Sequence, residues 1–281
     1  MSGSNGGSDS PVAGPDATLA YGHDHPDQVA DVILPRGAGA GPAPLVLFLH
    51  GGFWRARHDR LHAGEAAGAL AGQGYAVANV EYRRAGAGGG WPATFTDVAL
   101  AVDTLPGLVD AAYPGLVDLG RVVYCGHSAG GHLALWAAAR DRLPAAAPGR
   151  TDAAPRVAGV VGLGAVTDLA RAWRSGNGEG AVAEFLDGGP DDLPDRYAAA
   201  DPSRLGPPSV PTVLVHGDQD QRVPVEMARR YRDDFGAKLI ELPGTGHFEL
   251  IEPASTAWPH VLAAIEQVLR AGSPGTADRP D

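Results

Sequence analysis

Short apolar runs alternate with longer helical patterns along most of the chain. Apolar runs, of which Leu45-Val46-Leu47-Phe48-Leu49 is the most continuous, predict strands at 29–34, 45–50, 76–82, 121–125, 157–163, 212–216 and 238–242. Helical spacing predicts helices at 60–73, 95–110 with an interruption at Pro106, 129–140, 225–235 and 256–271. Continuous apolar runs are typical of strands covered on both faces, and their alternation with helices predicts an α/β fold with a mostly parallel central sheet flanked by helices.

The alternation breaks between the strands expected to end at residue 163 and to begin at residue 212. This stretch is rich in Gly, Pro and Asp and shows only weak helical patterns, at 168–174 and 180–185. A plain crossover needs far fewer residues, and loops of this length tend to be functional or disordered. We therefore expect a small lid inserted at about 166–208. Residues 1–17 and 272–281 are predicted to be a disordered leader and tail around a single domain, 18–271.

Composition and charge exclude several classes of function. The 281 residues are 44% hydrophobic, which is enough for a substantial core, and 33 acidic against 22 basic residues give a net charge of −11. Nucleic-acid and membrane partners are not expected, because both need a basic patch. The chain shows no apolar run of membrane-spanning length and no pattern of a secretory signal, so we expect a cytoplasmic location. With Cys125 as the single cysteine, no Cys-based metal cluster is possible, and no metal site is predicted.

The segment Gly126-His127-Ser128-Ala129-Gly130 carries the most specific chemical signal. An apolar strand runs into it and an Ala/Leu-rich helix follows, which is the context of a Gly-x-Ser-x-Gly nucleophile elbow. Such a turn lifts the Ser128 hydroxyl above the sheet, and the first N–H of the helix, that of Ala129, faces a developing oxyanion. The alternative is an ordinary Gly-rich turn between a strand and a helix.

A second signal follows the strand at 45–50, where the chain continues as His50-Gly51-Gly52-Phe53-Trp54. Glycines after a strand free backbone N–H groups to point at a substrate oxygen, as in the oxyanion loops of lipases and esterases. The expected donors are the N–H groups of Gly52 and Phe53. A simple Gly-Gly turn is the alternative.

The acid and the base of a catalytic triad are expected after two later strands. The strand at 212–216 leads to Asp218 and Asp220, and we favour Asp220 as the triad acid and Asp218 as a turn residue. His247 follows the last strand and completes the order Ser, Asp, His along the chain. His247 would then take the proton of Ser128, and Asp220 would hold the imidazole.

Together these segments resemble the α/β-hydrolase superfamily and, within it, the arylformamidase (kynurenine formamidase)-like esterases. The resemblance extends from about residue 21 to 271 and rests on the His-Gly-Gly-x-Trp loop and the Gly-His-Ser-Ala-Gly elbow. The same loop and elbow occur in carboxylesterases and in feruloyl or acetyl-xylan esterases. The resemblance implies an α/β-hydrolase fold, no cofactor, and substrates that are small esters or N-formyl amides.

Candidates for substrate binding are less specific. For six aromatic side chains, two interpretations are equally favoured: they line an apolar pocket that accepts an aryl group, or they only pack against their neighbours. These are Phe53, Trp54, Trp91, Trp173, Phe185 and Phe248. A substrate with a carboxylate would need a cation. The candidates are Arg55, Arg83 and Arg84, for which structural ion pairs are the favoured alternative.

We therefore expect a serine hydrolase that cleaves small carboxylic esters or aryl formamides through an acyl-enzyme. One alternative is a prolyl-oligopeptidase-type peptidase or a lactone hydrolase, which share the His-Gly-x-x-Asp-x-x-Val pattern that begins at His216. A lactone hydrolase of that type would carry Cys in place of Ser128. Another alternative is a non-catalytic small-molecule receptor on the same fold. The sequence leaves the oligomeric state open, a homodimer included.

Overall fold

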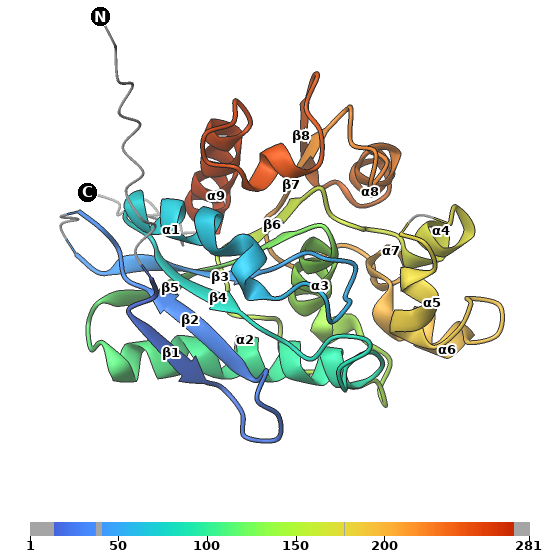
Figure 1. Cartoon of the computed structure of the whole chain (residues 1–281), viewed down its shortest axis with the longest axis horizontal. Helices are drawn as coiled ribbons and strands as arrows, with labels where there is room; N and C mark the ends of the chain where they lie inside the picture. Colours follow the sequence, from blue (N-terminus) through green and yellow to red (C-terminus); the bar gives the residue numbers. More distant parts are fainter. Residues whose placement is uncertain (1–13, 38–40, 177, 273–281) are drawn as a thin grey trace, which may run out of the picture.

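The computed structural model describes residues 14–37, 41–176 and 178–272, and its centre is an eight-stranded sheet (Figure 1). The spatial order is β1-β2-β4-β3-β5-β6-β7-β8; β2 is antiparallel to both of its neighbours, and all pairs from β4 to β8 are parallel. The predicted mostly parallel sheet is confirmed. The strands are β1 (Ala17–Ala20), β2 (Val29–Ile33), β3 (Ala43–Leu49), β4 (Ala76–Val80), β5 (Val117–His127), β6 (Gly159–Leu163), β7 (Thr212–Gly217) and β8 (Lys238–Leu242).

Helices cover both faces of this sheet, as Figure 1 shows. Along β3, Leu45, Leu47 and Leu49 join a core cluster with α2, α3 and α8, whereas Val46 and Phe48 join a second cluster with α1 and α9. This double burial explains why the strand is one continuous apolar run. The main helices outside the β6–β7 connection are α1 (Gly64–Gly72), α2 (Ala93–Ala112), α3 (Ala129–Ala138), α8 (Glu226–Phe235) and α9 (Trp258–Gly272).

Two features of the fold differ from the expectation. The helix predicted to be interrupted at Pro106 is one helix, α2, that continues through this proline. Pro106 lacks one N–H, but Leu105 and Val109 are fully buried on either side of it, so packing holds the helix together. Strand β1 was not predicted, because its four residues are only partly buried and form no apolar run.

The ends of the predicted domain are described in part. Strand β1 begins at Ala17, within the expected leader, and the Asp16 carboxylate before it accepts hydrogen bonds from Arg36 and from the Leu34 N–H. Residues 1–13 of the expected leader and 273–281 of the expected tail lie outside the described residues, so their predicted disorder stays a prediction.

The expected insertion connects β6 to β7 and contains four short helices. They are α4 (Leu169–Arg174), α5 (Ala181–Leu186), α6 (Pro194–Ala200) and α7 (Pro202–Leu205). The first two agree with the weak helical patterns of the sequence, whereas α6 and α7 were not predicted because each is under two turns long and begins with a proline. Phe185 of α5 stacks on Trp54 at 4.7 Å between ring centroids, which packs the insertion against the loop that follows β3.

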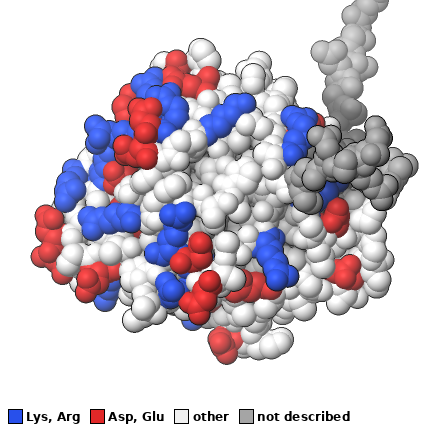
Figure 2. Space-filling model, turned by 180° about the vertical axis from the view of Figure 1, so that it is seen from behind, with Lys and Arg blue, Asp and Glu red and all other residues white. Residues whose placement is uncertain are grey.

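Two observations concern nucleic-acid and membrane partners: the distribution of charge on the surface and the character of the helices. Figure 2 shows Lys and Arg side chains interspersed with Asp and Glu side chains on the rear face, without a continuous basic patch. Of the helices that the structure describes, none has the length and the apolar character needed to cross a bilayer.

Candidate active site

The junction between β5 and α3 has the geometry of a sharp turn around Ser128. Ser128 adopts φ 56° and ψ −117°, a conformation that is unusual for a residue with a side chain, and its N–H donates to the Leu163 carbonyl at 2.8 Å. A Cβ on Gly126 would lie 2.2 Å from the Gly130 carbonyl oxygen, and one on Gly130 would lie 2.0 Å from the Leu49 carbonyl oxygen. Strand and helix therefore approach so closely that both positions require glycine.

The loop after β3 lies directly against this turn. A Cβ on Gly51 would lie 3.2 Å from the Ser128 Cβ. Gly52, Phe53 and Trp54 all have positive φ angles, of 113°, 57° and 56°. Neither the Gly52 N–H nor the Phe53 N–H donates to another described residue, and the Ala129 N–H, as the first of α3, has no partner within the helix. The three N–H groups expected to form an oxyanion hole are thus available to a ligand.

A buried contact between His50 and Glu81 anchors the loop that follows β3. His50 lies 3.0 Å, through Nε2, from the Glu81 carboxylate, stacks on the Tyr82 ring at 4.4 Å and accepts the Tyr82 hydroxyl on its carbonyl at 2.8 Å. Burial raises the pKa of Glu81, but the hydrogen bonds from His50 and from the Arg60 N–H, together with the Arg84 guanidinium, outweigh it and lower the pKa overall. Sequence reasoning missed Glu81; the available signal was a carboxylate at the carboxyl end of a fully buried strand.

Asp220 and His247 meet at the ends of β7 and β8. His247 Nδ1 lies 2.6 Å from Asp220 Oδ2, and both residues are buried. Asp220 Oδ1 accepts the backbone N–H groups of Arg222 and Val223 at 2.8 Å each, which fixes the carboxylate. Asp218, by contrast, accepts the Gly244 N–H at 2.7 Å and closes a turn. The geometry therefore brings Asp220, and not Asp218, to the imidazole.

The surroundings of Asp220 favour its ionised form. His216 Nε2 lies 2.9 Å from the Val223 carbonyl, so it carries a proton, and the same nitrogen is 3.3 Å from Asp220 Oδ2. Burial alone would raise the pKa of Asp220, but the hydrogen bonds from His216 and His247 outweigh it, and the pKa lies well below its usual range. His216 therefore braces the loop that carries Asp220.

His127 and Gly164 connect the serine turn to this pair. His127 Nε2 donates to the His247 carbonyl at 3.0 Å, and the two rings lie 4.5 Å apart. A Cβ on Gly164 would lie 3.1 Å from His247 Nδ1 and 3.2 Å from Asp220 Oδ2, while Leu163, the preceding residue, binds the Ser128 N–H. Ser128, His247 and Asp220 are thus gathered at the carboxyl ends of β5, β7 and β8, the edge where ligands bind in open α/β sheets.

Four of the six aromatic residues considered for the substrate pocket have different surroundings. Phe248 is 43% exposed and lies edge-on to the His247 ring at 5.3 Å, and Trp54 is buried and lines a small apolar hollow. Trp91 packs against Phe95 at 5.3 Å, and Trp173 is 38% exposed on α4; neither lines a hollow next to the serine turn. The apolar hollow is lined by Phe53, Trp54, Val166, Ala172, Val182, Arg222, Val223 and Met227.

The three arginines considered as carboxylate ligands are all engaged in ion pairs. Arg55 binds both carboxylate oxygens of Glu184, at 2.7 and 2.8 Å, and Arg83 binds both oxygens of Asp97. Arg84 pairs with Asp27 at 3.0 Å and with Glu81. These three side chains therefore form structural ion pairs, which was the favoured alternative for them. Within the described part of the chain, no cluster of three or more His, Cys, Asp or Glu side chains could hold a metal ion.

Comparison with known proteins gives both a family and relatives. Residues 30–234 match the family described as BD-FAE. The chain is 30% identical to Esterase LipC of Mycobacterium tuberculosis (strain ATCC 25618 / H37Rv) over 85% of its own length, and 28% identical to Probable carboxylic ester hydrolase LipM of the same strain over 82%. It spans only 61% and 54% of the length of these two relatives.

A solved structure extends the similarity to three dimensions. Bacterial Heroin Esterase superposes with a TM-score of 0.69 at 25% sequence identity, over 95% of this chain and 87% of that one. The match includes nearly all described elements, so the two proteins share the same fold.

Proposed function

The chain belongs to the BD-FAE family and has the α/β-hydrolase fold, and from this premise we propose that it hydrolyses small carboxylic esters with Ser128, His247 and Asp220 as a catalytic triad. The observation that carries the proposal is the 2.6 Å contact between His247 Nδ1 and Asp220 Oδ2 beside the turn that presents Ser128. The esterase names of the relatives support the same reaction class.

The reaction proceeds in two halves. The Ser128 oxygen attacks the ester carbonyl carbon while His247 Nε2 accepts the hydroxyl proton, and Asp220 stabilises the imidazolium through Nδ1. The tetrahedral intermediate collapses with transfer of that proton to the departing alkoxide, which leaves an acyl-serine. Water then attacks the acyl carbon with His247 again as base, and the acid product departs from a regenerated Ser128.

The oxyanion is bound by the N–H groups of Gly52, Phe53 and Ala129. The backbone of Phe53 is held in a positive-φ conformation and its loop is anchored through His50, so these donors are fixed before the substrate arrives. A preorganised donor of this kind contributes about 3 kcal/mol to lowering the barrier, because no reorganisation is needed as charge develops.

The substrates are small, with one apolar part. The side chains of Phe53, Trp54 and Val166 line a narrow apolar hollow, which favours a small apolar group on the substrate. The same attack on a carbonyl carbon applies to simple esters and to aryl formamides. A cytoplasmic location is part of this proposal, and cell fractionation tests it. Light scattering on the purified chain measures whether the chain is a monomer or a homodimer.

The central test compares Ser128→Ala with the wild-type chain on p-nitrophenyl acetate and an aryl formamide. We expect turnover to disappear in the variant while its circular dichroism spectrum and melting temperature are retained. Ser209→Ala removes the same hydroxyl from an exposed position and is the matched control. Undiminished hydrolysis by Ser128→Ala would overturn the mechanism, and a wild-type chain that binds esters without cleaving them would indicate a receptor.

A further inference from the structure

Three arginines line a hollow beside the loop that follows β3. This hollow has a volume of about 240 Å³, and the side chains that matter for its charge and shape are Phe53, Arg55, Arg57, Glu179, Gln221 and Arg222. Arg57 belongs to the segment after β3, and Arg222 follows Asp220 by two positions. The hollow therefore lies between the two segments that carry the proposed oxyanion donors and the proposed triad acid.

The charges around the hollow leave an excess of cations. Arg55 is neutralised by its two-point contact with Glu184. Arg57 and Arg222 are exposed, and their guanidinium groups form no ion pair and no hydrogen bond with any residue that the structure describes. Glu179 is the single carboxylate that lines the hollow, so one positive charge remains unbalanced in a chain whose net charge is −11.

This hollow and the apolar one have two lining residues in common. Phe53 and Arg222 line both. The Arg222 N–H also donates to Asp220 Oδ1 at 2.8 Å, which fixes the base of this side chain relative to the proposed triad. A ligand that lies in the larger hollow beside Phe53 is thus within the field of two unpaired guanidinium groups.

We propose that Arg57 and Arg222 select substrates that carry a carboxylate in addition to the scissile ester. This inference rests on the proposed function and narrows its substrate class. A guanidinium presents parallel N–H donors that match the two oxygens of a carboxylate, and unpaired guanidiniums lose no existing partner on binding. The arginines considered from sequence for this role, Arg55, Arg83 and Arg84, form instead the ion pairs that were the favoured alternative for them.

The test measures preference between matched neutral and anionic esters. The ratio of kcat/KM for 3-acetoxybenzoate over phenyl acetate reports a carboxylate on the leaving group. The same ratio for mono-p-nitrophenyl succinate over p-nitrophenyl butyrate reports a carboxylate on the acyl group. We expect one of the two ratios to fall at least tenfold in the Arg57→Gln/Arg222→Gln double variant, and the affected ratio identifies the side. Arg156→Gln removes one exposed, unpaired charge just before β6, at the opposite end of the sheet, and should leave both ratios unchanged.

A binding measurement separates this inference from the proposed function. Calorimetry of Ser128→Ala with 3-acetoxybenzoate and mono-p-nitrophenyl succinate needs no turnover, and the double substitution in that background should weaken the tighter of the two at least tenfold. A wild-type chain inactive on every ester would overturn the esterase proposal, yet this binding loss would still support the carboxylate subsite. Ratios and affinities that are unchanged in the double variant, or that fall equally in Arg156→Gln, would overturn the subsite.

Discussion

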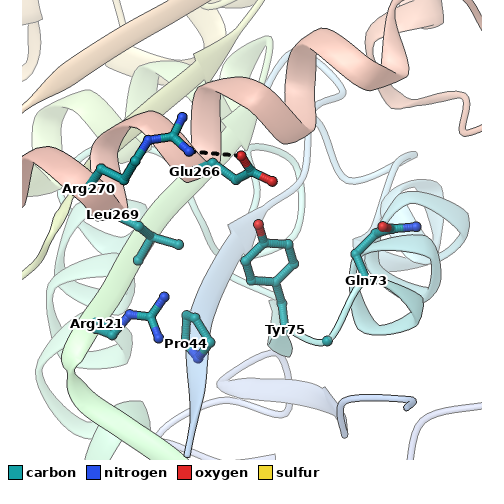
Figure 3. Close-up of a pocket in the computed structure, with 8 residues that line it drawn as sticks. Pro44, Gln73, Tyr75, Arg121, Glu266, Leu269 and Arg270 are labelled. Carbon is teal, nitrogen blue, oxygen red and sulfur yellow. Dashed lines mark hydrogen bonds and ion pairs between the residues drawn. The ribbon is translucent and has the colours of Figure 1, made fainter. Parts of the chain in front are cut away.

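The carboxyl and amino ends of the parallel strands differ in backbone strain and in buried charged residues. All five described non-glycine residues with positive φ lie in segments that follow the carboxyl ends of strands; they are Phe53, Trp54, Ser128, Glu179 and Asp187. The buried pairs His50–Glu81 and His247–Asp220 lie at the same end. The amino end has a hollow of about 390 Å³ between the starts of β3 and β4 and the last turns of α9 (Figure 3), but its positive-φ residues are glycines.

This contrast shows that the size of a hollow does not identify the functional end of this molecule. Figure 3 shows Arg121 and Tyr75 facing the amino-end hollow and Arg270 paired with Glu266 above it. These groups are charged or polar, but the ion pair lies on the surface, where it contributes little. Backbone strain and buried charge cost stability and persist where they serve a site, and both are concentrated at the carboxyl end.

The largest effect at the carboxyl end is expected for Asp220→Asn. The amide cannot stabilise an imidazolium and favours the wrong tautomer of His247, so kcat should fall by about 10⁴-fold. Steady-state kinetics on p-nitrophenyl acetate measures this loss.

Asp218→Asn is the matched control for that substitution. Asp218 accepts only the Gly244 N–H in its turn, so kcat should change by less than about threefold. If Asp218→Asn were the more damaging of the two, Asp218 would be the triad acid and the contrast between these two carboxylates would be reversed.

The second prediction concerns the backbone at the same end. Gly130→Ala places a methyl group 2.0 Å from the Leu49 carbonyl oxygen, which side-chain movement cannot relieve, and should destabilise the fold by about 3 kcal/mol or more. Gly107→Ala in α2 meets no atom within 4 Å and should instead stabilise by up to about 1 kcal/mol. Urea unfolding followed by circular dichroism compares them, and equal effects would show that the close approach at Gly130 has no energetic importance.

Much of the fold could be predicted, because its signals are local. Strands buried on both faces appear as apolar runs, and the glycines at 126 and 130 mark where strand and helix touch. Strand β1 and helices α6 and α7 could not be found, since they are short and their stability comes from neighbours and not from their own pattern. Packing also carried α2 through Pro106, against the rule that proline interrupts a helix.

The sequence predicts which residues could form a catalytic triad, but it does not predict which arginines near the site form ion pairs. Ser128 is predicted from its elbow motif, Asp220 from its place after a strand, and His247 from the order along the chain. Their roles stay predictions that the kinetics above will test. Which arginines are free depends on contacts across more than a hundred positions, such as that of Arg55 with Glu184. No local pattern reports such a contact, so the sequence gives no reason to consider Arg57 and Arg222.

The third prediction tests whether His127 positions the imidazole. Burial lowers the pKa of His127 well below its usual range, so the ring is neutral, and its one N–H donates to the His247 carbonyl. His127→Leu removes this donor and should lower kcat about tenfold with a smaller change in KM, since the loop that carries His247 loses one support. His127→Gln keeps a donor of similar reach and should recover most of the loss. Equal losses in both variants would indicate a packing role only.

The fourth prediction uses acid to remove the charge on Asp220. Its pKa is depressed in the folded protein, so the ionised carboxylate contributes stability above the unfolded pKa of about 4, and this contribution is lost as the pH falls toward the folded pKa. The wild-type chain should therefore exceed Asp220→Asn in free energy of unfolding at pH 6, and the difference should shrink between pH 4 and pH 3. A difference that is constant with pH would mean that the carboxylate is not stabilised by its hydrogen bonds.

The smallest effect is expected at the amino end, where Arg121 faces the hollow of Figure 3. Like Arg57 and Arg222, Arg121 forms no ion pair with a described residue, but no strained backbone or buried carboxylate accompanies it. Arg121→Gln should change kcat, the preference for anionic esters and the free energy of unfolding by no more than about twofold or 0.5 kcal/mol. A loss of anionic preference as large as that of the Arg57→Gln/Arg222→Gln double variant would mean that total charge steers the substrate. Unchanged preference would mean that selectivity depends on where the arginines lie, beside the serine turn.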